Sequence, residues 1–322
     1  MIVEALGAGL LVVAAVVVYR RRPQARSPES VASTPAAPVQ RKPPWESCYR
    51  PPRLGLDHPV EPCETFRAIG FLGEGAMATV YLAQEPSGRK VALKLVRPEM
   101  ALDTEFQQRF QREIEIVRRL SHPNVVEVYA AGVAQQRMFM AMEWVEGCTL
   151  DQILSPGPLA LEEFHRLARQ MAQVFHFAHQ RQLLHRDIKP GNLMVTLQGQ
   201  VKVLDFGLAL QQGQSRFTSV GFSMGTPSHM APEVLTTGQA TAQSDQYALG
   251  IVFYQMLVGQ LPFQARNPIE LGMMHVTKEP PPLRKARPEL PSELETLILR
   301  MLAKEPERRF AALGEVALAL SS

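Results

Sequence analysis

The 322-residue sequence is poor in cysteine and nearly balanced in charge. Its three cysteines, Cys48, Cys63 and Cys148, lack metal-ligand spacing, and an odd number is typical of free thiols in a reducing compartment. The formal net charge is only +3, and the basic excess lies in residues 20–53, so that residues 54–322 sum to about −2. The charge therefore gives no reason to expect nucleic-acid binding by the main domain.

Charged side chains are also absent from residues 5–19, and Glu4 is the single charge before them. As a helix, residues 1–19 would reach about 28 Å, close to the roughly 30 Å of a hydrocarbon core. We expect a transmembrane helix over this range. A cleaved signal peptide is the alternative, but it needs a basic start, whereas here the arginines at 20–22 follow the apolar run. Because such arginines stay in the cytoplasm, the sequence predicts a single-pass protein with its main domain on the cytoplasmic side.

Residues 20–62 carry ten prolines and no apolar period, and we expect a disordered juxtamembrane tether. Its arginines either fix the topology alone or also bind anionic lipid. The proline pair before Trp45 is a candidate docking site for a proline-binding module.

The most informative stretch is residues 185–192, His-Arg-Asp-Ile-Lys-Pro-Gly-Asn, which Asp-Phe-Gly follows at residues 205–207. Phosphoryl transfer to an alcohol needs a carboxylate that orients the alcohol and accepts its proton, oxygen ligands for divalent ions, and a cation beside the phosphate. Asp187 can meet the first need and Lys189 the last. Asn192 and Asp205 are the candidate ligands for Mg²⁺.

These motifs resemble the catalytic loop and metal-binding triplet of eukaryotic-type (Hanks-type) serine/threonine protein kinases, most of all bacterial membrane-tethered members. The resemblance implies a two-lobed α+β fold after the transmembrane helix. We expect a small β-rich lobe over residues 63–146 and a larger, mostly helical lobe over residues 147–322.

The nucleotide-binding part of the resemblance begins with short β-rich runs joined by Gly-Glu-Gly-Ala-Met-Ala at residues 73–78. Small residues let a backbone close over phosphates, although Ala78 stands where the family has its third glycine. The family pattern implies that Lys94 meets the α and β phosphates of ATP and that Glu113 pairs with Lys94 in the active state. The expected ATP-binding residues are Leu72, Gly73, Gly75, Ala78, Val80, Ala92, Lys94, Glu113, Met142, Glu143, Val145 and Met194. Residues 142–147, Met-Glu-Trp-Val-Glu-Gly, resemble the hinge of the family, which joins the two lobes. Cys148, which follows the hinge, is expected to be an ordinary free thiol.

In the larger lobe, apolar spacing predicts a buried helix from Leu161 to Gln180. The resemblance implies that the ring of His185 packs on Phe206 and that Asp245 anchors the backbone of the catalytic loop. It further implies that Glu233 pairs with Arg309, with Arg308 as the competing partner. Thr226 is expected to hydrogen-bond to the catalytic Asp187 and Lys189.

Residues 208–233 match the activation segment of the family. Arg186 is the residue that often binds a phosphate there, and Thr218, Ser219 and Ser223 are the candidate phosphate acceptors. Their alternative role is that of plain polar loop residues. His229 stands where the family has tyrosine, which leaves its packing and pH sensitivity open.

The sequence therefore predicts a kinase that moves the γ-phosphoryl group of MgATP to serine or threonine of protein substrates, held at a membrane. Regulation by autophosphorylation between two copies would need at least a transient homodimer. A pseudokinase scaffold and a small-molecule phosphotransferase are the alternatives. The presence of Lys94, Asp187, Asn192 and Asp205 argues against the scaffold, and the peptide-docking segment at residues 225–233 argues against a small-molecule substrate.

Overall fold

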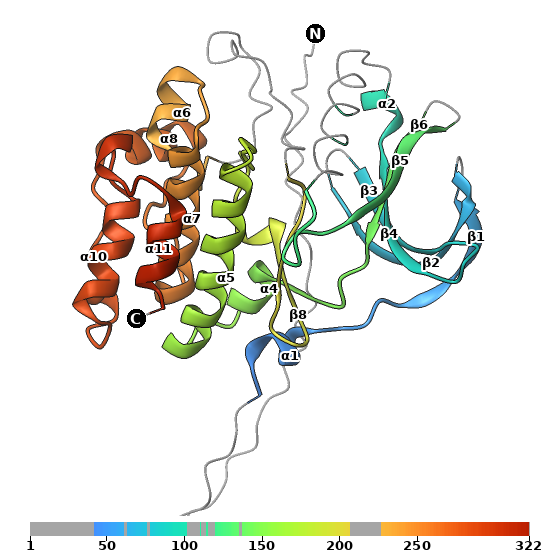
Figure 1. Ribbon diagram of the computed structural model, residues 1–322, viewed down its shortest axis with the longest axis horizontal. Coiled ribbons are helices and arrows are strands. Elements are labelled where there is room, and N and C mark those ends of the chain that lie inside the picture. The colour runs from blue at the N-terminus through green and yellow to red at the C-terminus, as the bar shows by residue number, and fades with distance from the viewer. Residues whose placement is uncertain are drawn as a thin grey trace, which may run out of the picture.

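The computed structural model describes residues 42–60, 63–75, 78–101, 110, 114, 120–134, 137–206 and 227–321. Within these ranges the chain forms two lobes, a sheet-based smaller lobe and a helical larger lobe (Figure 1). The expected transmembrane helix at residues 1–19 lies outside the described residues. No helix among the described residues is long and apolar enough to cross a membrane.

The smaller lobe is built on a six-stranded antiparallel sheet of order β1-β2-β3-β4-β6-β5. Successive side chains of a strand point to opposite faces of the sheet, and this determines which face its functional residues occupy. In β4 the residues Val91, Leu93 and Leu95 are buried under the sheet, so Lys94 lies on the opposite face. The strands are β1 (Leu54–Val60), β2 (Cys63–Glu74), β3 (Ala78–Gln84), β4 (Lys90–Val96), β5 (Val128–Ala134) and β6 (Arg137–Glu143), and the short helix α2 (Pro98–Ala101) follows β4.

A second, three-stranded sheet of order β7-β8-β9 carries the segments next to the catalytic loop. It comprises β7 (Gly147–Thr149), β8 (Leu193–Thr196) and β9 (Val201–Val203). The helices of the larger lobe are α4 (Leu150–Leu154), α5 (Leu161–His179), α6 (Pro232–Thr237), α7 (Ala242–Val258), α8 (Pro268–Thr277), α9 (Leu283–Ala286), α10 (Ser292–Met301) and α11 (Leu313–Ala319), with 3₁₀ turns at Pro190–Asn192 and Pro306–Arg308.

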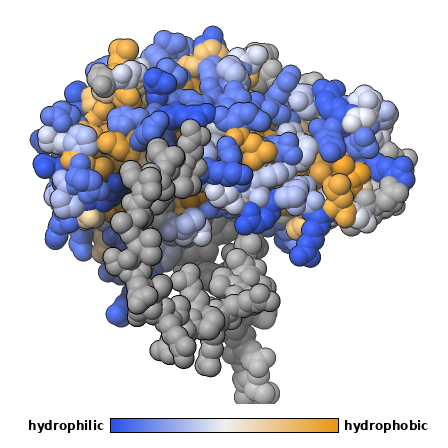
Figure 2. Space-filling model, turned by 90° about the horizontal axis from the view of Figure 1, so that it is seen from below, coloured by the Kyte–Doolittle hydropathy of each residue, from blue (hydrophilic) through white to orange (hydrophobic). Residues whose placement is uncertain are grey.

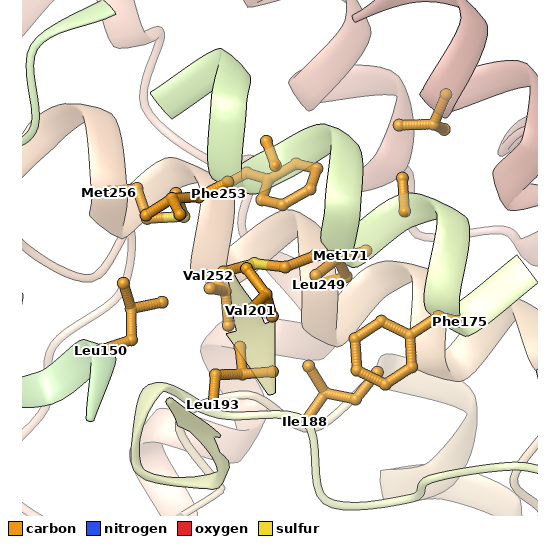
Figure 3. Packing of buried hydrophobic residues seen from close by; sticks show 14 of the residues in the cluster. Leu150, Met171, Phe175, Ile188, Leu193, Val201, Leu249, Val252, Phe253 and Met256 are labelled. Atoms are coloured by element: carbon orange, nitrogen blue, oxygen red, sulfur yellow. The ribbon is translucent and has the colours of Figure 1, made fainter. Parts of the chain in front are cut away.

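Helices α5 and α7 form the centre of the larger lobe. Helix α7 is buried on nearly all sides, which is the pattern of a central core helix. Apolar side chains from α4, α5, α7, β8, β9 and the catalytic loop point toward one another there (Figure 3). Ile188 of the catalytic loop belongs to this cluster, so its side chain packs the loop against the core of the larger lobe. The face in Figure 2 is mostly hydrophilic, with its apolar residues in separate patches.

The segment expected to be a disordered tether is ordered in its second half. Helix α1 (Pro44–Cys48) and strand β1 lie within residues 20–62, and Trp45 is only 2% exposed. Disorder is therefore the wrong prediction for these two elements. Trp45 is buried in the core of the larger lobe, and β1 forms backbone hydrogen bonds with β2. These interactions offset the conformational entropy that the two elements lose when they become ordered.

Two of the three cysteines are joined in a disulfide, Cys48 to Cys148. The prediction of free thiols is wrong for both, and Cys148 is not the ordinary thiol expected after the hinge. The two residues are 100 positions apart in sequence, so only the docking of α1 brings their Cα atoms to 6.4 Å.

Candidate active site

Asp245 of α7 holds the backbone of the catalytic loop, as predicted. Its carboxylate accepts hydrogen bonds from the backbone N–H groups of His185 (2.8 Å) and Arg186 (2.9 Å). Nε2 of His179 lies 2.9 Å from the same carboxylate. Arg186 has a φ of 68°, a conformation that is uncommon for a residue other than glycine, and its bond to Asp245 helps to hold it there. The buried aspartate thus determines the shape of the loop.

His185 is a structural residue rather than a base. Its ring packs edge-on against Phe206, with ring centroids 5.0 Å apart. Nε2 lies 2.9 Å from the backbone oxygen of Leu204, and Nδ1 lies 3.3 Å from the backbone nitrogen of Asp187. Since a carbonyl oxygen only accepts and a backbone N–H only donates, the ring proton belongs on Nε2. The histidine therefore connects the catalytic loop to the segment that contains Asp205, as predicted.

Asp187, Lys189 and Asn192 lie together at the open side of this loop. Nζ of Lys189 is 2.7 Å from Oδ2 of Asp187. The amide nitrogen of Asn192 donates to the backbone oxygen of Asp187 (2.8 Å) and to its Oδ2 (2.9 Å). The side chains of Asp187 and Lys189 are 45% and 47% exposed, so a hydroxyl group arriving from solvent can reach them.

Asp151 of α4 adds a carboxylate beside the catalytic loop. Its Oδ2 lies 3.0 Å from the position that a Cβ atom at Gly191 would occupy. Burial raises the pKa of Asp151, and the positive charge of Lys189 partly opposes that shift. The motif reasoning missed this residue, because it belongs to a short helix with no fixed pattern of its own.

Lys94 forms a two-pronged ion pair with Asp205, with Nζ 2.8 Å from each carboxylate oxygen. Burial alone would raise the pKa of Asp205, but the charge and hydrogen bonds of Lys94 outweigh it and hold that pKa below its ordinary value. Asp205 is therefore ionised at neutral pH. Glu113, the expected partner of Lys94, lies outside the described residues.

Four of the expected ATP-binding residues lie in or against one hydrophobic cluster. Met142 and Val145 belong to this cluster, and Ala92 and Met194 pack against it. These residues come from β4, the end of β6, the hinge and β8, so the cluster spans the junction of the two lobes.

The glycine-rich loop joins β2 to β3. The backbone N–H of Gly75 donates to the carbonyl of Ala78 (2.8 Å). Gly73 has open space around its missing Cβ, and Leu72 is 37% exposed. Ala78 is 6% exposed and pairs with Val96, so the residue that replaces the family's third glycine is part of the sheet. Val80 lies opposite Lys94 in the same strand pair.

Glu143, an expected hinge residue, uses its side chain within the protein. Its carboxylate pairs with Lys202 of β9 at 2.6 Å, and both side chains are largely buried, with exposed fractions of 25% and 12%. The backbone N–H of Glu143 donates to the carbonyl of Glu127 (2.8 Å). Sequence reasoning missed Lys202. The alternation of buried Val201 and Val203 places it on the other face of β9, but nothing in the sequence indicates that Glu143 lies opposite.

Glu233 pairs with Arg309 rather than with Arg308, as predicted. The two contacts measure 2.8 and 2.9 Å, and the side chain of Arg309 is fully buried. His229, at the family's tyrosine position, has its Nδ1 3.0 Å from the hydroxyl oxygen of Ser228. Burial lowers the pKa of His229 to about 4, so its ring is neutral at pH 7. Thr226 and the candidate phosphate acceptors Thr218, Ser219 and Ser223 lie outside the described residues.

Asn192 and Asp205 fit a hard cation such as Mg²⁺ in their chemistry. Because Asn192 donates its amide nitrogen to Asp187, its Oδ1 is left as the ligand atom, and the ionised Asp205 supplies carboxylate oxygens. Among the described residues, no group of three or more histidine, cysteine, aspartate or glutamate side chains could hold a metal ion by itself. Two protein ligands with the rest from phosphate and water is the arrangement that Mg²⁺ commonly adopts.

Comparison with known proteins agrees with this geometry. Residues 66–317 match the model of the protein kinase domain. The chain is 36% identical over 247 residues to the serine/threonine-protein kinase PrkC of Bacillus subtilis, covering 76% of this chain and 38% of PrkC. It is 34% identical over 254 residues to PknB of Mycobacterium tuberculosis, covering 76% of this chain and 41% of PknB.

The solved kinase domain of Mycobacterium tuberculosis PknI superposes with a TM-score of 0.65 at 33% identity, over 80% of this chain and 95% of that domain. The chain spans about two fifths of the length of the curated relatives it matches. The family match covers most of the chain, and the fold and the positions of the catalytic loop agree with it. This chain belongs to the protein kinase family, among the bacterial serine/threonine protein kinases of the Hanks type.

Proposed function

We propose that this protein transfers the γ-phosphoryl group of ATP to serine or threonine hydroxyl groups of protein substrates. The main observation in support is that Lys189 and Asn192 contact the carboxylate of the half-exposed Asp187. The ion pair of Lys94 with Asp205 lies at the junction of the two lobes. Family membership and the names of the serine/threonine kinase relatives support the same reaction.

Each residue has a separate task in this reaction. Asp187 orients the incoming hydroxyl group and accepts its proton, and Lys189 stabilises negative charge that develops on the group in transfer. Asn192 and Asp205 would hold Mg²⁺, which neutralises the phosphate oxygens when it is bound. Lys94 contacts the α and β phosphates. Its present pairing with Asp205 keeps both charges compensated until the nucleotide provides other partners.

The nucleotide contacts belong to the same proposal. The adenine ring lies between Val80 and Ala92 on one side and Met194 on the other, with Met142 at the back. Backbone groups of Glu143 and Val145 bind its edge, and Leu72, Gly73, Gly75 and Ala78 cover the phosphates. Glu113 pairs with Lys94 in the active form. Thr226 supports Asp187 and Lys189.

The reaction is tested with the 322-residue chain, labelled ATP and Mg²⁺. Asp187→Asn should lower label transfer to a generic protein substrate by about 10²- to 10⁴-fold, the usual contribution of a general base. Glu162→Gln, an exposed change at the start of α5, is the matched control and should keep full activity. Equal transfer by Asp187→Asn and the unchanged chain would refute the assignment. Nucleotide binding without transfer by the unchanged chain would favour the pseudokinase scaffold.

Regulation by phosphorylation of the activation segment is the second part of the proposal. Arg186 is exposed and adjacent to Asp187, so it can bind a phosphate at Thr218, Ser219 or Ser223. A mixture of the active chain with a shortened Asp187→Asn chain should show phosphate on the inactive copy if the reaction occurs between two copies. Mass spectrometry that finds no phosphate at these three residues would refute it.

Membrane attachment through residues 1–19 is the third part, supported by the uncharged stretch and the arginines that follow it. It places the kinase domain on the cytoplasmic side. The full chain should remain with membranes after alkaline carbonate extraction, and deletion of residues 1–19 should release it. Release of the full chain by carbonate would refute the anchor.

A further inference from the structure

Residues 43–60 lie ahead of the family match at residues 66–317 and contact both lobes. We call this segment the N-terminal strap. Figure 1 shows it running from α1, under the larger lobe beside α4 and β8, across to β1 at the outer edge of the small-lobe sheet. A segment that is attached to both lobes has to respond whenever the lobes move.

The strap is anchored to the larger lobe by Trp45. The indole is 2% exposed and belongs to the same core cluster as α5 and α7. The guanidinium carbon of Arg166 lies 5.2 Å from its ring centroid. A Cβ atom at Gly199 would come within 3.0 Å of the indole, and Gly199 has a φ of 77°. The turn between β8 and β9 therefore leaves space for Trp45 because residue 199 has no side chain.

A covalent link fixes the strap to the position directly after the hinge. Cys48 ends α1, and its disulfide partner Cys148 lies in β7, three residues after Val145. Cys148 is 1% exposed, whereas Cys48 is only partly buried, so a reductant approaches from the strap side. Next to it, the hydroxyl of Tyr49 donates to the carboxylate of Glu146 in the hinge segment at 3.1 Å.

The other end of the strap belongs to the smaller lobe. Strand β1 pairs with β2 in antiparallel register, with Leu54 opposite Gly70 and Pro59 opposite Arg67. A Cβ atom at Gly70 would lie 3.2 Å from the backbone oxygen of Arg53, so the two backbones approach closely there. Strand β2 is also the strand that leads into the glycine-rich loop at Gly73. The strap is therefore attached to the small-lobe sheet through β1 and to the core of the larger lobe through α1.

We propose that Cys48 and Cys148 form a thiol–disulfide exchange site that controls how freely the lobes open. In the oxidised protein the strap is locked at the hinge, and the release of nucleotide is slowed. A dithiol reductant attacks the disulfide with one thiolate, and its second thiolate then displaces the protein sulfur. The reductant becomes a disulfide, its two protons and two electrons pass to Cys48 and Cys148, and the strap is held by non-covalent contacts alone.

Two physical arguments support the control of nucleotide exchange. Opening and closing of lobes or lids around a ligand often limits how fast the ligand leaves. Disulfides in reducing cytosol are usually transient and redox-sensing, so a cytoplasmic kinase domain would carry this link only under oxidising conditions. The inference rests on the proposed nucleotide binding but not on phosphoryl transfer.

The test measures dissociation of a fluorescent ADP analogue from the purified 322-residue chain by stopped flow, before and after treatment with dithiothreitol. We expect reduction to speed dissociation by about fivefold or more. Cys48→Ser should show the fast rate with and without dithiothreitol. Cys63→Ser is the matched control and should respond as the unchanged chain does. Tyr49→Phe keeps the disulfide but loses the bond to Glu146, and should accelerate release by a smaller factor.

Thiol titration of the denatured, non-reduced protein provides a check that does not depend on nucleotide. One thiol per chain is expected, because the disulfide occupies two of the three cysteines. Three thiols after purification under oxidising conditions would overturn the proposal. Equal dissociation rates before and after reduction, in a protein that binds the nucleotide, would overturn it and leave the proposed kinase function intact. A chain that binds no nucleotide in either state would overturn both.

Discussion

Arg309 is the residue whose loss should destabilise the larger lobe most clearly. Its guanidinium group has five N–H donors, and the structure provides five acceptor contacts. Nε donates to the carbonyl of Ala303, and the two terminal nitrogens donate to the carboxylate oxygens of Glu233 and to the carbonyls of Gln243 and Lys304, all within 2.7 to 3.0 Å. The side chain is 0% exposed and that of Glu233 is 15% exposed.

Arg309→Ala removes one partner of this buried pair and leaves the other without compensation. Breaking a buried ion pair in this way costs about 3–5 kcal/mol. The free energy of unfolding of a stable domain is about 5–15 kcal/mol, so this loss is a large part of the total stability. The free energy of unfolding falls by about 1–3 kcal/mol for each molar of urea, so the urea concentration at the midpoint of unfolding should fall by roughly 1 M or more.

The assay is urea unfolding followed by circular dichroism. Arg308→Ala is the matched control, because its side chain is 75% exposed and lies 3.6 Å from Glu305 at the surface. A surface pair of this kind contributes little, so the control should stay within about 0.5 kcal/mol of the unchanged chain. A loss below about 1 kcal/mol for Arg309→Ala, or an equal loss for both variants, would refute the reasoning.

Three further predictions concern the catalytic loop, the hinge and pH. Asp245→Ala leaves the buried N–H group of His185 and the part-buried N–H group of Arg186 without acceptors. An unsatisfied buried group costs about 1–3 kcal/mol, so stability and activity should fall together in unfolding and kinase assays, and unchanged activity would contradict the anchoring role. Lys202→Met breaks the largely buried ion pair with Glu143 at the hinge. Because the hinge is proposed to bind the adenine ring, KM for ATP should rise several-fold while kcat changes less. An unchanged KM would show that the pair does not support the hinge. Burial lowers the pKa of His229 to about 4, so between about pH 4 and 6.5 the unfolded chain binds more protons than the folded chain. The stability that the neutral ring contributes is therefore present above about pH 6.5 and lost as pH falls toward 4. His229→Phe should weaken this acid dependence in thermal unfolding at pH 4 to 7, and an unchanged dependence would contradict the assignment.

Much of the catalytic centre could be predicted from the sequence because its parts are close together along the chain. The residues from His185 to Asn192 have a fixed spacing that matches one chemistry, and the structure brings Asp187, Lys189 and Asn192 together as that spacing requires. Asp245 and Arg309 were also predictable, although they are distant, because the family pattern identifies their local motifs and their partners. The family pattern also identified Lys94, and in the structure the alternation of buried residues along β4 leaves it on the face opposite the core.

The sequence by itself thus determined the fold class, the motif residues proposed to carry the chemistry and the buried helix that begins at Leu161. Only the tertiary structure decided the contacts that no local pattern encodes. These are the docking of Trp45, the Cys48–Cys148 disulfide and the pair of Glu143 with Lys202. In each of them the partners lie at least 59 residues apart, and their meeting depends on how separate elements pack. A proline-rich composition predicts disorder only as long as no apolar surface elsewhere in the chain receives a large apolar side chain such as Trp45.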